Sequence, residues 1–249
     1  MTKVAIAFDL YGTLLSTESI ATELARIYGE GQAKTIAVQA RRYQLEYTWR
    51  SNSMGVYRPF VDLTRHSFRH ATAEANLDLS MDHEERIMEA YNGLDSFTDA
   101  EKGLALVSQT LAIDPYIFSN GTVDMITASL KTSPSLAKSP VTFPESRVVS
   151  VDPLKVFKPD PKTYQHVAKV AGFESQPEKV YLISSNPFDA MGAVAAGLKS
   201  IWVCRQDTEW IDGLSGALNV RPTAVVDGVD EAVREIIKLE GLTELTKSM

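Results

Sequence analysis

Cysteine is nearly absent from the 249-residue chain, in which Cys204 is the single example. One cysteine cannot form an internal disulfide, and it excludes a metal centre built from a cysteine cluster. The composition therefore favours a reducing compartment, and we expect the protein in the cytoplasm. The chain also lacks an apolar run of the about 18 residues that a membrane-spanning helix needs, so no membrane association is expected.

Positive charge is in deficit. The chain has 25 Lys and Arg against 32 Asp and Glu, a net charge of -7, which argues against nucleic acid as a main partner. Phosphate-binding glycine motifs are missing, so nucleotide use is not expected. The Gly-x-Ser-x-Gly motif of serine hydrolases is missing as well. A hydrophobic share of 44% and a charged share of 23% are ordinary for a folded globular protein.

Strand-like and helix-like segments alternate along most of the chain, which indicates a parallel sheet in an α/β fold. The predicted strands are 4–8, 116–118, 147–150, 180–183, 200–203 and 224–226. The predicted helices among them are 100–112, 122–131, 161–171, 188–196 and 229–239. The Pro- and Ser-rich stretch 132–144 is predicted to be an exposed loop.

Residues 16–92 differ from this pattern because they contain no convincing strand. Apolar residues at helical spacing up to Tyr28 predict one helix, which Gly29 and Gly31 would end, and further helices are predicted over 32–50, 60–76 and 81–91. We therefore expect a Rossmann-like core of residues 1–15 and 95–249, with helices on both faces of its sheet. An all-helical domain, residues 16–94, would be inserted after the first strand.

Polar residues follow four of the predicted strands. Because ligands bind at the carboxyl ends of parallel strands, these residues are candidates for a common site. They are Asp9, Thr13, Ser119, Asn120, Lys155, Lys158, Ser184, Ser185, Asn186 and Asp189. One such residue alone carries little weight, whereas four strand ends that meet at one edge indicate an active site.

Four segments resemble the motifs of the haloacid dehalogenase superfamily. They are Phe8-Asp9-Leu10-Tyr11-Gly12-Thr13-Leu14, Ser119-Asn120-Gly121, Lys158-Pro159-Asp160-Pro161 and Ser184-Ser185-Asn186-x-x-Asp189. The stretch Gln44-Leu45-Glu46-Tyr47-Thr48-Trp49 resembles the helical cap of the (S)-2-haloacid dehalogenase branch. The resemblance implies a Rossmann-like core with an inserted helical cap, and a hydrolase acting on carbon–halide bonds.

Two positions favour this branch over the phosphatases of the superfamily. Tyr11 stands two residues after Asp9, where the phosphatases have a general acid. Ser185 stands four residues before Asp189, where they have an acidic Mg²⁺ ligand. We therefore expect no metal and no cofactor. A Mg²⁺-dependent phosphatase acting on a small phosphomonoester, and a non-catalytic binding protein with this fold, remain as alternatives.

The resemblance implies that Asp9 attacks a short-chain (S)-2-haloalkanoic acid, forms an aspartyl ester, and yields an (R)-2-hydroxy acid and a halide. The other catalytic residues implied are Thr13, Arg41 as halide acceptor, Ser119, Lys158, Tyr164, Ser184, Asn186 and Asp189. The substrate-binding residues implied are Leu10, Tyr11, Arg41, Leu45, Phe60, Ser119, Asn120 and Phe188. A homodimer is also implied.

Two residues allow two interpretations each. Tyr164 either serves catalysis beside Lys158 or packs its helix against the sheet. Arg42 stands where the family commonly has an amide side chain. It either affects which haloacid fits or is simply a solvated helix residue.

Overall fold

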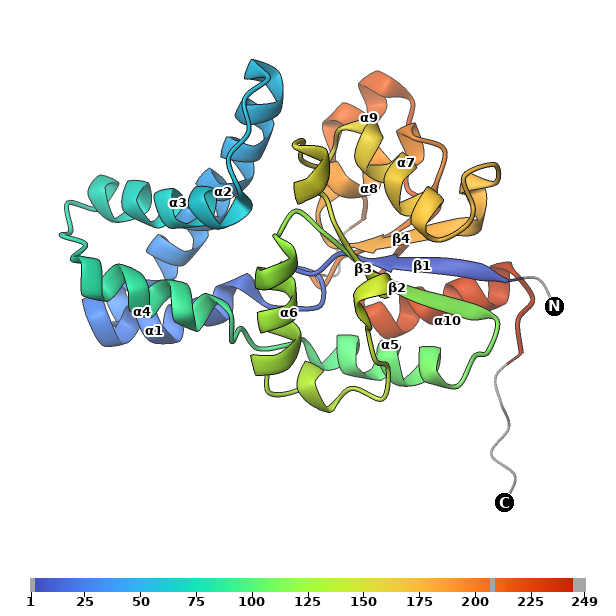
Figure 1. The fold of residues 1–249 in the computed structure, drawn as a ribbon, viewed down its shortest axis with the longest axis horizontal. Helices are drawn as coiled ribbons and strands as arrows, with labels where there is room; N and C mark the ends of the chain where they lie inside the picture. Colours follow the sequence, from blue (N-terminus) through green and yellow to red (C-terminus); the bar gives the residue numbers. More distant parts are fainter. Residues whose placement is uncertain (1–2, 207–208, 244–249) are drawn as a thin grey trace.

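The computed structural model describes residues 3–206 and 209–243, and its centre is a parallel β-sheet (Figure 1). In this part of the chain six strands lie in the order β3-β2-β1-β4-β5-β6. They are β1 (Val4–Phe8), β2 (Ile113–Ser119), β3 (Val148–Ser150), β4 (Val180–Ser184), β5 (Lys199–Val203) and β6 (Ala224–Val226). The order reverses direction at β1, and such a switch point is where open α/β sheets bind ligands.

Helices cover both faces of the sheet (Figure 1). Helices α5 (Thr98–Ser108) and α10 (Val229–Leu239) pack together on one face, with α6 (Val123–Thr132) beside β3. On the other face lie α7 (Pro161–Val170), α8 (Pro187–Ala195) and the short α9 (Gly213–Leu218). The structure thus confirms the predicted α/β fold class.

β1 is central to the sheet, and all five of its residues are buried, as expected for a parallel strand covered on both faces. Phe8 at its end pairs with Ile117 of β2 and Ile183 of β4. This register brings the last residues of the three strands, and the residues that follow them, to one edge of the sheet. Asp9, Ser119 and Ser184 are therefore near neighbours although they are far apart in sequence.

Residues 17–91 form a helical block between β1 and α5, at one side of the sheet (Figure 1). The block consists of a 3-10 turn η1 (Thr17–Ile20) and helices α1 (Ala21–Tyr28), α2 (Glu30–Met54), α3 (Phe60–Glu74) and α4 (Met81–Tyr91). Gly29, with φ of 81°, separates α1 from α2, and Gly55, with φ of 64°, ends α2. Gly31 lies inside α2, so the prediction that it ends a helix was wrong.

Four further features differ from the predictions. The predicted helix 100–112 ends earlier, because α5 stops at Ser108. The predicted strand 116–118 begins earlier, because β2 starts at Ile113 although Pro115 has no backbone N–H to donate. Pro115 is tolerated because β3 pairs with β2 only from Ile117 onward, so that side of the strand has no partner at residue 115. The stretch 132–144 is not simply an exposed loop, since it contains a 3-10 turn and buries Leu136. Helix α9 was not predicted, and Gly213 and Gly216 make it inconspicuous in the sequence.

No helix among residues 3–206 and 209–243 has the length and apolar character required to cross a bilayer.

Candidate active site

Asp9 lies directly after β1, at the switch point of the sheet, and is only 5% exposed. Its Oδ1 accepts a hydrogen bond from Lys158 Nζ at 2.9 Å. Its Oδ2 accepts hydrogen bonds from Thr13 Oγ1 at 2.7 Å, Asn186 Nδ2 at 2.8 Å and Ser184 Oγ at 3.4 Å. Hydrogen bonds of this kind stabilise the negative charge and fix the orientation of the carboxylate.

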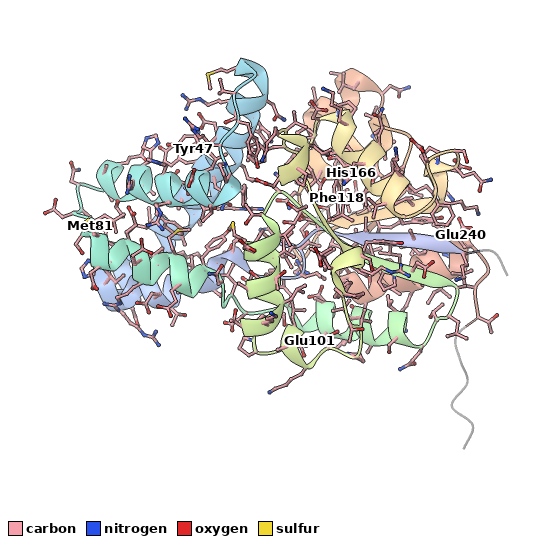
Figure 2. The ribbon with its side chains drawn as sticks, in the orientation of Figure 1. Tyr47, Met81, Glu101, Phe118, His166 and Glu240 are labelled. Atoms are coloured by element: carbon pink, nitrogen blue, oxygen red, sulfur yellow. The ribbon has the colours of Figure 1, made fainter. Side chains whose placement is uncertain are left out.

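Lys158 lies between two carboxylates and is 1% exposed. Its Nζ donates to Asp9 Oδ1, to Asp189 Oδ2 at 2.7 Å and to the Phe118 carbonyl at 3.1 Å, which uses all three of its N–H bonds. Phe118 is labelled in Figure 2. Burial by itself lowers the pKa of a lysine, but the charges and hydrogen bonds of Asp189 and Asp9 raise the pKa of Lys158 above its ordinary value. Lys158 is therefore a fixed cation at neutral pH.

Asp189, in the first turn of α8, is fully buried. Besides Lys158, it contacts Tyr164 of α7, whose hydroxyl donates to Asp189 Oδ1 at 2.8 Å. Burial and the nearby charge of Asp9 raise the pKa of Asp189, against the opposing effect of Lys158. We refer to Asp9, Lys158 and Asp189 as the Lys158 cluster. It places two carboxylates around one ammonium in the interior of the protein.

Arg41 reaches the same place from α2 of the helical block. Its Nη2 donates to the Tyr11 carbonyl at 2.7 Å and to Asn186 Oδ1 at 3.3 Å. The backbone at Gly12 has a φ of 94°, and a Cβ there would lie 3.4 Å from Arg41 Nη2. Glycine therefore permits both the turn after Asp9 and the close approach of the guanidinium.

Three buried aromatic residues line up beside Asp9 and form what we call the aromatic wall: Tyr11, Phe60 and Tyr91. The ring of Tyr11 is 6.0 Å from that of Phe60 and 5.4 Å from that of Tyr91, measured between centroids. Burial raises the pKa of Tyr11, and its neutral hydroxyl forms a hydrogen bond with Ser129 Oγ at 3.2 Å. Tyr11 is thus held as an apolar surface and is not poised to act as an acid.

The remaining predicted substrate-binding residues lie around this wall or at the contact between α2 and the core. Leu10 is fully buried, and Leu45 on α2 is half-buried. Phe188 on α8 is also half-buried, and its ring centroid is 5.2 Å from that of Trp49 on α2. The contact between Trp49 and Phe188 joins the helical block to the core.

Ser119, the last residue of β2, and Asn120 directly after it are both buried and bound to backbone groups. Ser119 Oγ accepts a hydrogen bond from the Gly121 N–H at 3.1 Å. Asn120 Oδ1 accepts one from the Lys158 N–H at 2.9 Å. Asn120 therefore supports the backbone that carries Lys158, a contact that the sequence did not indicate.

Two residues considered in the sequence lie away from the cluster. Arg42 is exposed, which agrees with its interpretation as a solvated helix residue. Lys155 is exposed too, and its Nζ pairs with Asp152 Oδ2 at 3.2 Å. The ammonium group at this edge is thus that of Lys158.

Gln44 is a functional candidate that the sequence analysis missed. Its Oε1 accepts a hydrogen bond from Arg41 Nη1 at 2.7 Å, and its Nε2 donates to Thr64 Oγ1 at 2.6 Å and Tyr91 Oη at 3.1 Å. The amide is 1% exposed and orients the guanidinium. The available signal was spacing, since residues three apart on a helix face the same side.

Arg205 was missed as well. It follows β5, and its Nη1 donates to Ser185 Oγ at 3.0 Å while its Nη2 donates to the Thr13 carbonyl at 2.8 Å and pairs with Asp99 at 2.7 Å. The survey of strand ends in the sequence stopped at β4. Extending it by one strand would have found this residue.

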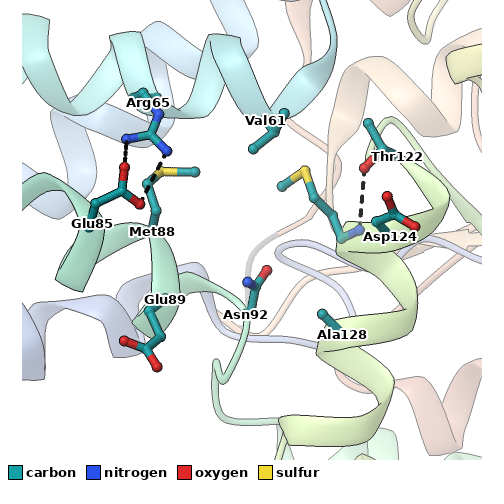
Figure 3. Close-up of a pocket in the computed structure, with 10 residues that line it drawn as sticks. Val61, Arg65, Glu85, Met88, Glu89, Asn92, Thr122, Asp124 and Ala128 are labelled. Atoms are coloured by element: carbon teal, nitrogen blue, oxygen red, sulfur yellow. Dashed lines mark hydrogen bonds and ion pairs between the residues drawn. The ribbon is translucent and has the colours of Figure 1, made fainter.

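A cavity of about 580 Å³ lies between α3 and α4 of the helical block and α6 of the core (Figure 3). It is lined by Val61, Arg65, Glu85, Met88, Glu89, Asn92, Thr122, Asp124, Met125 and Ala128. None of these is a predicted site residue. Three carboxylates line the cavity, so an anionic ligand is disfavoured there. The catalytic candidate is instead the enclosed edge around Asp9.

Comparison with known proteins agrees with this geometry. Residues 4–197 match the family model of haloacid dehalogenase-like hydrolases. The chain is 34% identical over 205 residues to the (S)-2-haloacid dehalogenase of Xanthobacter autotrophicus, covering 82% of this chain and 76% of the relative. It is 30% identical to the (S)-2-haloacid dehalogenase of Pseudomonas putida, covering 91% and 93%.

A solved structure is similar throughout. The L-2-haloacid dehalogenase from Xanthobacter autotrophicus with chloropropionic acid covalently bound superimposes with a TM-score of 0.78 at 29% identity, covering 95% of this chain and 98% of that one. The chain belongs to the haloacid dehalogenase-like hydrolases. Within them it falls in the (S)-2-haloacid dehalogenase branch, whose members are hydrolases of carbon–halide bonds.

Proposed function

We propose that the protein hydrolyses short-chain (S)-2-haloalkanoic acids to (R)-2-hydroxy acids and halide through an ester on Asp9. The observation that carries the proposal is the Asp9 carboxylate, which is buried, paired with Lys158, and oriented by Thr13 and Asn186. The covalently bound chloropropionic acid in the Xanthobacter relative supports a covalent route.

In the first step an Asp9 oxygen forms a bond to Cα of the substrate as the carbon–halogen bond breaks and the halide leaves with the bonding electrons. The attack comes from the side opposite the halogen, so the configuration inverts. In the second step water adds to the Asp9 carbonyl carbon, and the bond from that carbon to the substrate oxygen breaks. One proton of the attacking water goes to the released alkoxide, and the other passes to solvent by way of Asp189, so that Asp9 is again a carboxylate and each turnover releases one proton. Neither departure of halide nor regeneration of Asp9 consumes a net proton.

The surrounding residues have the roles that these steps require. Arg41 is a cation at the Tyr11 end of the site and suits a departing halide. Lys158 neutralises the Asp9 carboxylate, while Asp189, held by Tyr164, is the second carboxylate available to the hydrolytic water. We assign Ser184 and Asn186 to the orientation of Asp9 and of that water.

The remaining residues bind the substrate. We assign Ser119, Asn120 and the backbone after Leu10 to its carboxylate. Its alkyl group would contact the aromatic wall together with Leu45 and Phe188.

We further propose that this chemistry needs no metal. The oxygens that would ligate a cation already accept hydrogen bonds: both Asp9 oxygens, the Tyr11 carbonyl from Arg41, and Ser185 Oγ from Arg205. Two guanidinium groups thus supply positive charge on this side of Asp9. A hard divalent cation would have to displace these donors.

The helical block is proposed to act as a cap, residues 16–94, over a core of residues 1–15 and 95–249. Through Arg41 and the Phe60 and Tyr91 rings of the aromatic wall it would exclude water from the carboxylate, which strengthens the electrostatic interactions there. We also propose a homodimer in the cytoplasm, and light scattering after gel filtration would measure the oligomeric state.

The decisive experiment measures halide release from (S)-2-chloropropionate in the presence of excess EDTA, with the (R) enantiomer and Asp9→Asn as controls. We expect release from the (S) substrate alone, an (R)-lactate product, and no release by Asp9→Asn. Mass spectrometry of the rapidly quenched enzyme should show the acid as an adduct on Asp9. Absence of release, or release that requires Mg²⁺, would refute the proposal. Mg²⁺-restored turnover of a phosphomonoester would favour a phosphatase.

A further inference from the structure

Helix α2 contacts three separate loops of the core along its length. Arg41 reaches the turn after β1, Trp49 contacts Phe188 after β4, and Asn52 near its end contacts the loop after β3. The first two contacts are part of the site described above. The third lies beside Lys158 and has no counterpart in the motifs.

Asn52 binds both backbone groups of Phe157. Its Nδ2 donates to the Phe157 carbonyl at 2.7 Å, and its Oδ1 accepts from the Phe157 N–H at 2.9 Å. The two bonds form a pair like that between strands, made by one side chain from the helical block. Phe157 is fully buried and directly precedes Lys158.

The backbone around Lys158 depends on such contacts because it has no regular structure of its own. The short 3-10 turn η4 (Asp152–Leu154) ends before it, and α7 begins only at Pro161. The Lys158 N–H is held by Asn120 of the core, and the preceding residue is held by Asn52 of the helical block. One asparagine from each part of the molecule thus anchors this segment.

We propose that Asn52 is a positioning residue for Lys158, an inference that rests on the proposed function. The contacts of α2 with the core would then position both the guanidinium of Arg41 and the ammonium of Lys158. The ammonium must meet Asp9, Asp189 and the Phe118 carbonyl within 2.7–3.1 Å. A shift of about 1 Å in a catalytic group can reduce a rate by about 100-fold, so a loosened backbone here affects the chemical steps.

Tyr57 provides a matched control. It lies between α2 and α3, five residues after Asn52, and its hydroxyl donates to Asp152 in the same core loop. The Tyr57 ring stacks on that of Phe157, 5.0 Å between centroids, and Tyr57→Phe keeps this contact. The variant removes only the bond to Asp152, six residues before Lys158, and leaves the backbone next to the lysine untouched. If Asn52 served only to attach the helical block to the core, loss of the Asn52 contact and loss of the Tyr57 contact should have the same effect.

The experiment compares Asn52→Ala, Asn52→Asp and Tyr57→Phe with the wild type in steady-state halide release. We expect kcat to fall about 10-fold in Asn52→Ala with KM within about twofold. Asn52→Asp should lose at least as much, because a carboxylate oxygen would face the Phe157 carbonyl. Tyr57→Phe should keep kcat within about twofold. Equal effects of Asn52→Ala and Tyr57→Phe, or a change in KM alone, would overturn the proposal.

A second measurement does not depend on turnover. NMR of the buried Lys158 ammonium reports its hydrogen-bond partners directly, and its signal should shift or broaden in Asn52→Ala and stay in place in Tyr57→Phe. If the wild type releases no halide, the proposed function fails, and this signal alone decides the role of Asn52. An ammonium signal that is the same in both variants refutes the role.

Discussion

Two charge clusters occupy opposite ends of the same sheet. The Lys158 cluster lies where the strands end. At the start of β4 and β5, Glu240 accepts hydrogen bonds from Lys179 Nζ at 2.7 Å, Lys199 Nζ at 2.8 Å and Tyr181 Oη at 2.7 Å. We call this group the Glu240 cluster. Glu240 lies at the end of the sheet from which β1 starts (Figure 2).

The two clusters contain the same chemical groups in inverse proportion. One ammonium serves two carboxylates in the Lys158 cluster, and the pKa of Asp189 is raised by burial and by Asp9. Two ammonium groups serve one carboxylate in the Glu240 cluster. Although burial opposes it, the hydrogen bonds of Lys179, Lys199 and Tyr181 lower the pKa of Glu240 to about 2. Excess negative charge in a closed site favours reactivity, whereas excess positive charge around a carboxylate favours stability.

The largest effect is expected from Lys158→Met. It leaves Asp9 and Asp189 buried without a counter-charge, and breaking a buried pair in this way costs about 3–5 kcal/mol of unfolding free energy. Halide release should fall by at least about 1,000-fold, because the charge that stabilises the nucleophile is gone. Urea unfolding at pH 7 and an ion-selective electrode measure the two effects.

Lys179→Met is the control for this variant, since its side chain is 27% exposed and Lys199 still pairs with Glu240. It should cost no more than about 1 kcal/mol. An equal loss of unfolding free energy in Lys158→Met and Lys179→Met would show that burial of the lysine does not determine its contribution to stability.

Glu240→Gln should lower the unfolding free energy by about 1–2 kcal/mol while kcat stays unchanged. The loss is smaller than for Lys158→Met because Lys179 and Lys199, 27% and 34% exposed, can turn toward water. Thermal unfolding and halide release on the same sample test this separation. A lowered kcat in the folded variant would contradict it.

The Glu240 cluster should lose its contribution to stability in acid, and the Lys158 cluster should lose its contribution in alkali. The pKa of Glu240 is lower in the folded protein than the unfolded value of about 4.3, so its stabilisation is complete above about pH 5 and is lost as the pH falls toward 2. The pKa of Lys158 is raised, so its stabilisation is complete below the unfolded value of about 10.4 and is lost as the pH rises through the folded value.

Urea titrations between pH 3 and 10.5 measure the acid side of this dependence. The stability difference between wild type and Glu240→Gln should shrink in acid and stay constant in alkali. A stability difference that grows in acid would contradict the predicted lowering of the Glu240 pKa in the folded protein.

The smallest effects should come from a matched pair of tyrosines. Burial and Glu240 raise the pKa of Tyr181 to about 12 against the influence of Lys199, so its hydroxyl donates at neutral pH. Tyr181→Phe should cost about 1 kcal/mol of stability and leave kcat unchanged. Tyr164→Phe, which removes the hydrogen bond to Asp189, should lower kcat several-fold. Unchanged kcat in Tyr164→Phe would leave packing as the role of Tyr164.

The sheet was predictable from sequence because its signals are local. The apolar runs at Val4–Phe8 and Val180–Ser184 are flanked by helix-like segments, and the structure has strands at both. The start of β2 was missed because the effect of Pro115 depends on where β3 begins to pair. That is a property of the assembled sheet and not of the segment.

The predicted site residues cluster because the register of three strands brings their ends together. Sequence could not indicate how the oxygens and nitrogens divide among partners. Asn120, for example, binds the Lys158 backbone, and this contact joins elements that are distant in the chain. Arg205 was accessible to the same reasoning and was missed only because one strand end was not considered.

The central position of β1 has a consequence for biosynthesis. β1 leaves the ribosome first, but its sheet partners are Ile113–Ser119 and Val180–Ser184, with the whole helical block made in between. At about 5–20 residues per second, the strand waits roughly 10–35 s before the later partner has been synthesised. Until β2 has been synthesised this fully apolar segment has both edges unpaired, and until β4 follows it still has one unpaired edge, which is a state prone to aggregation. Yield in rapidly expressing cells is thus expected to depend on chaperones that shield β1.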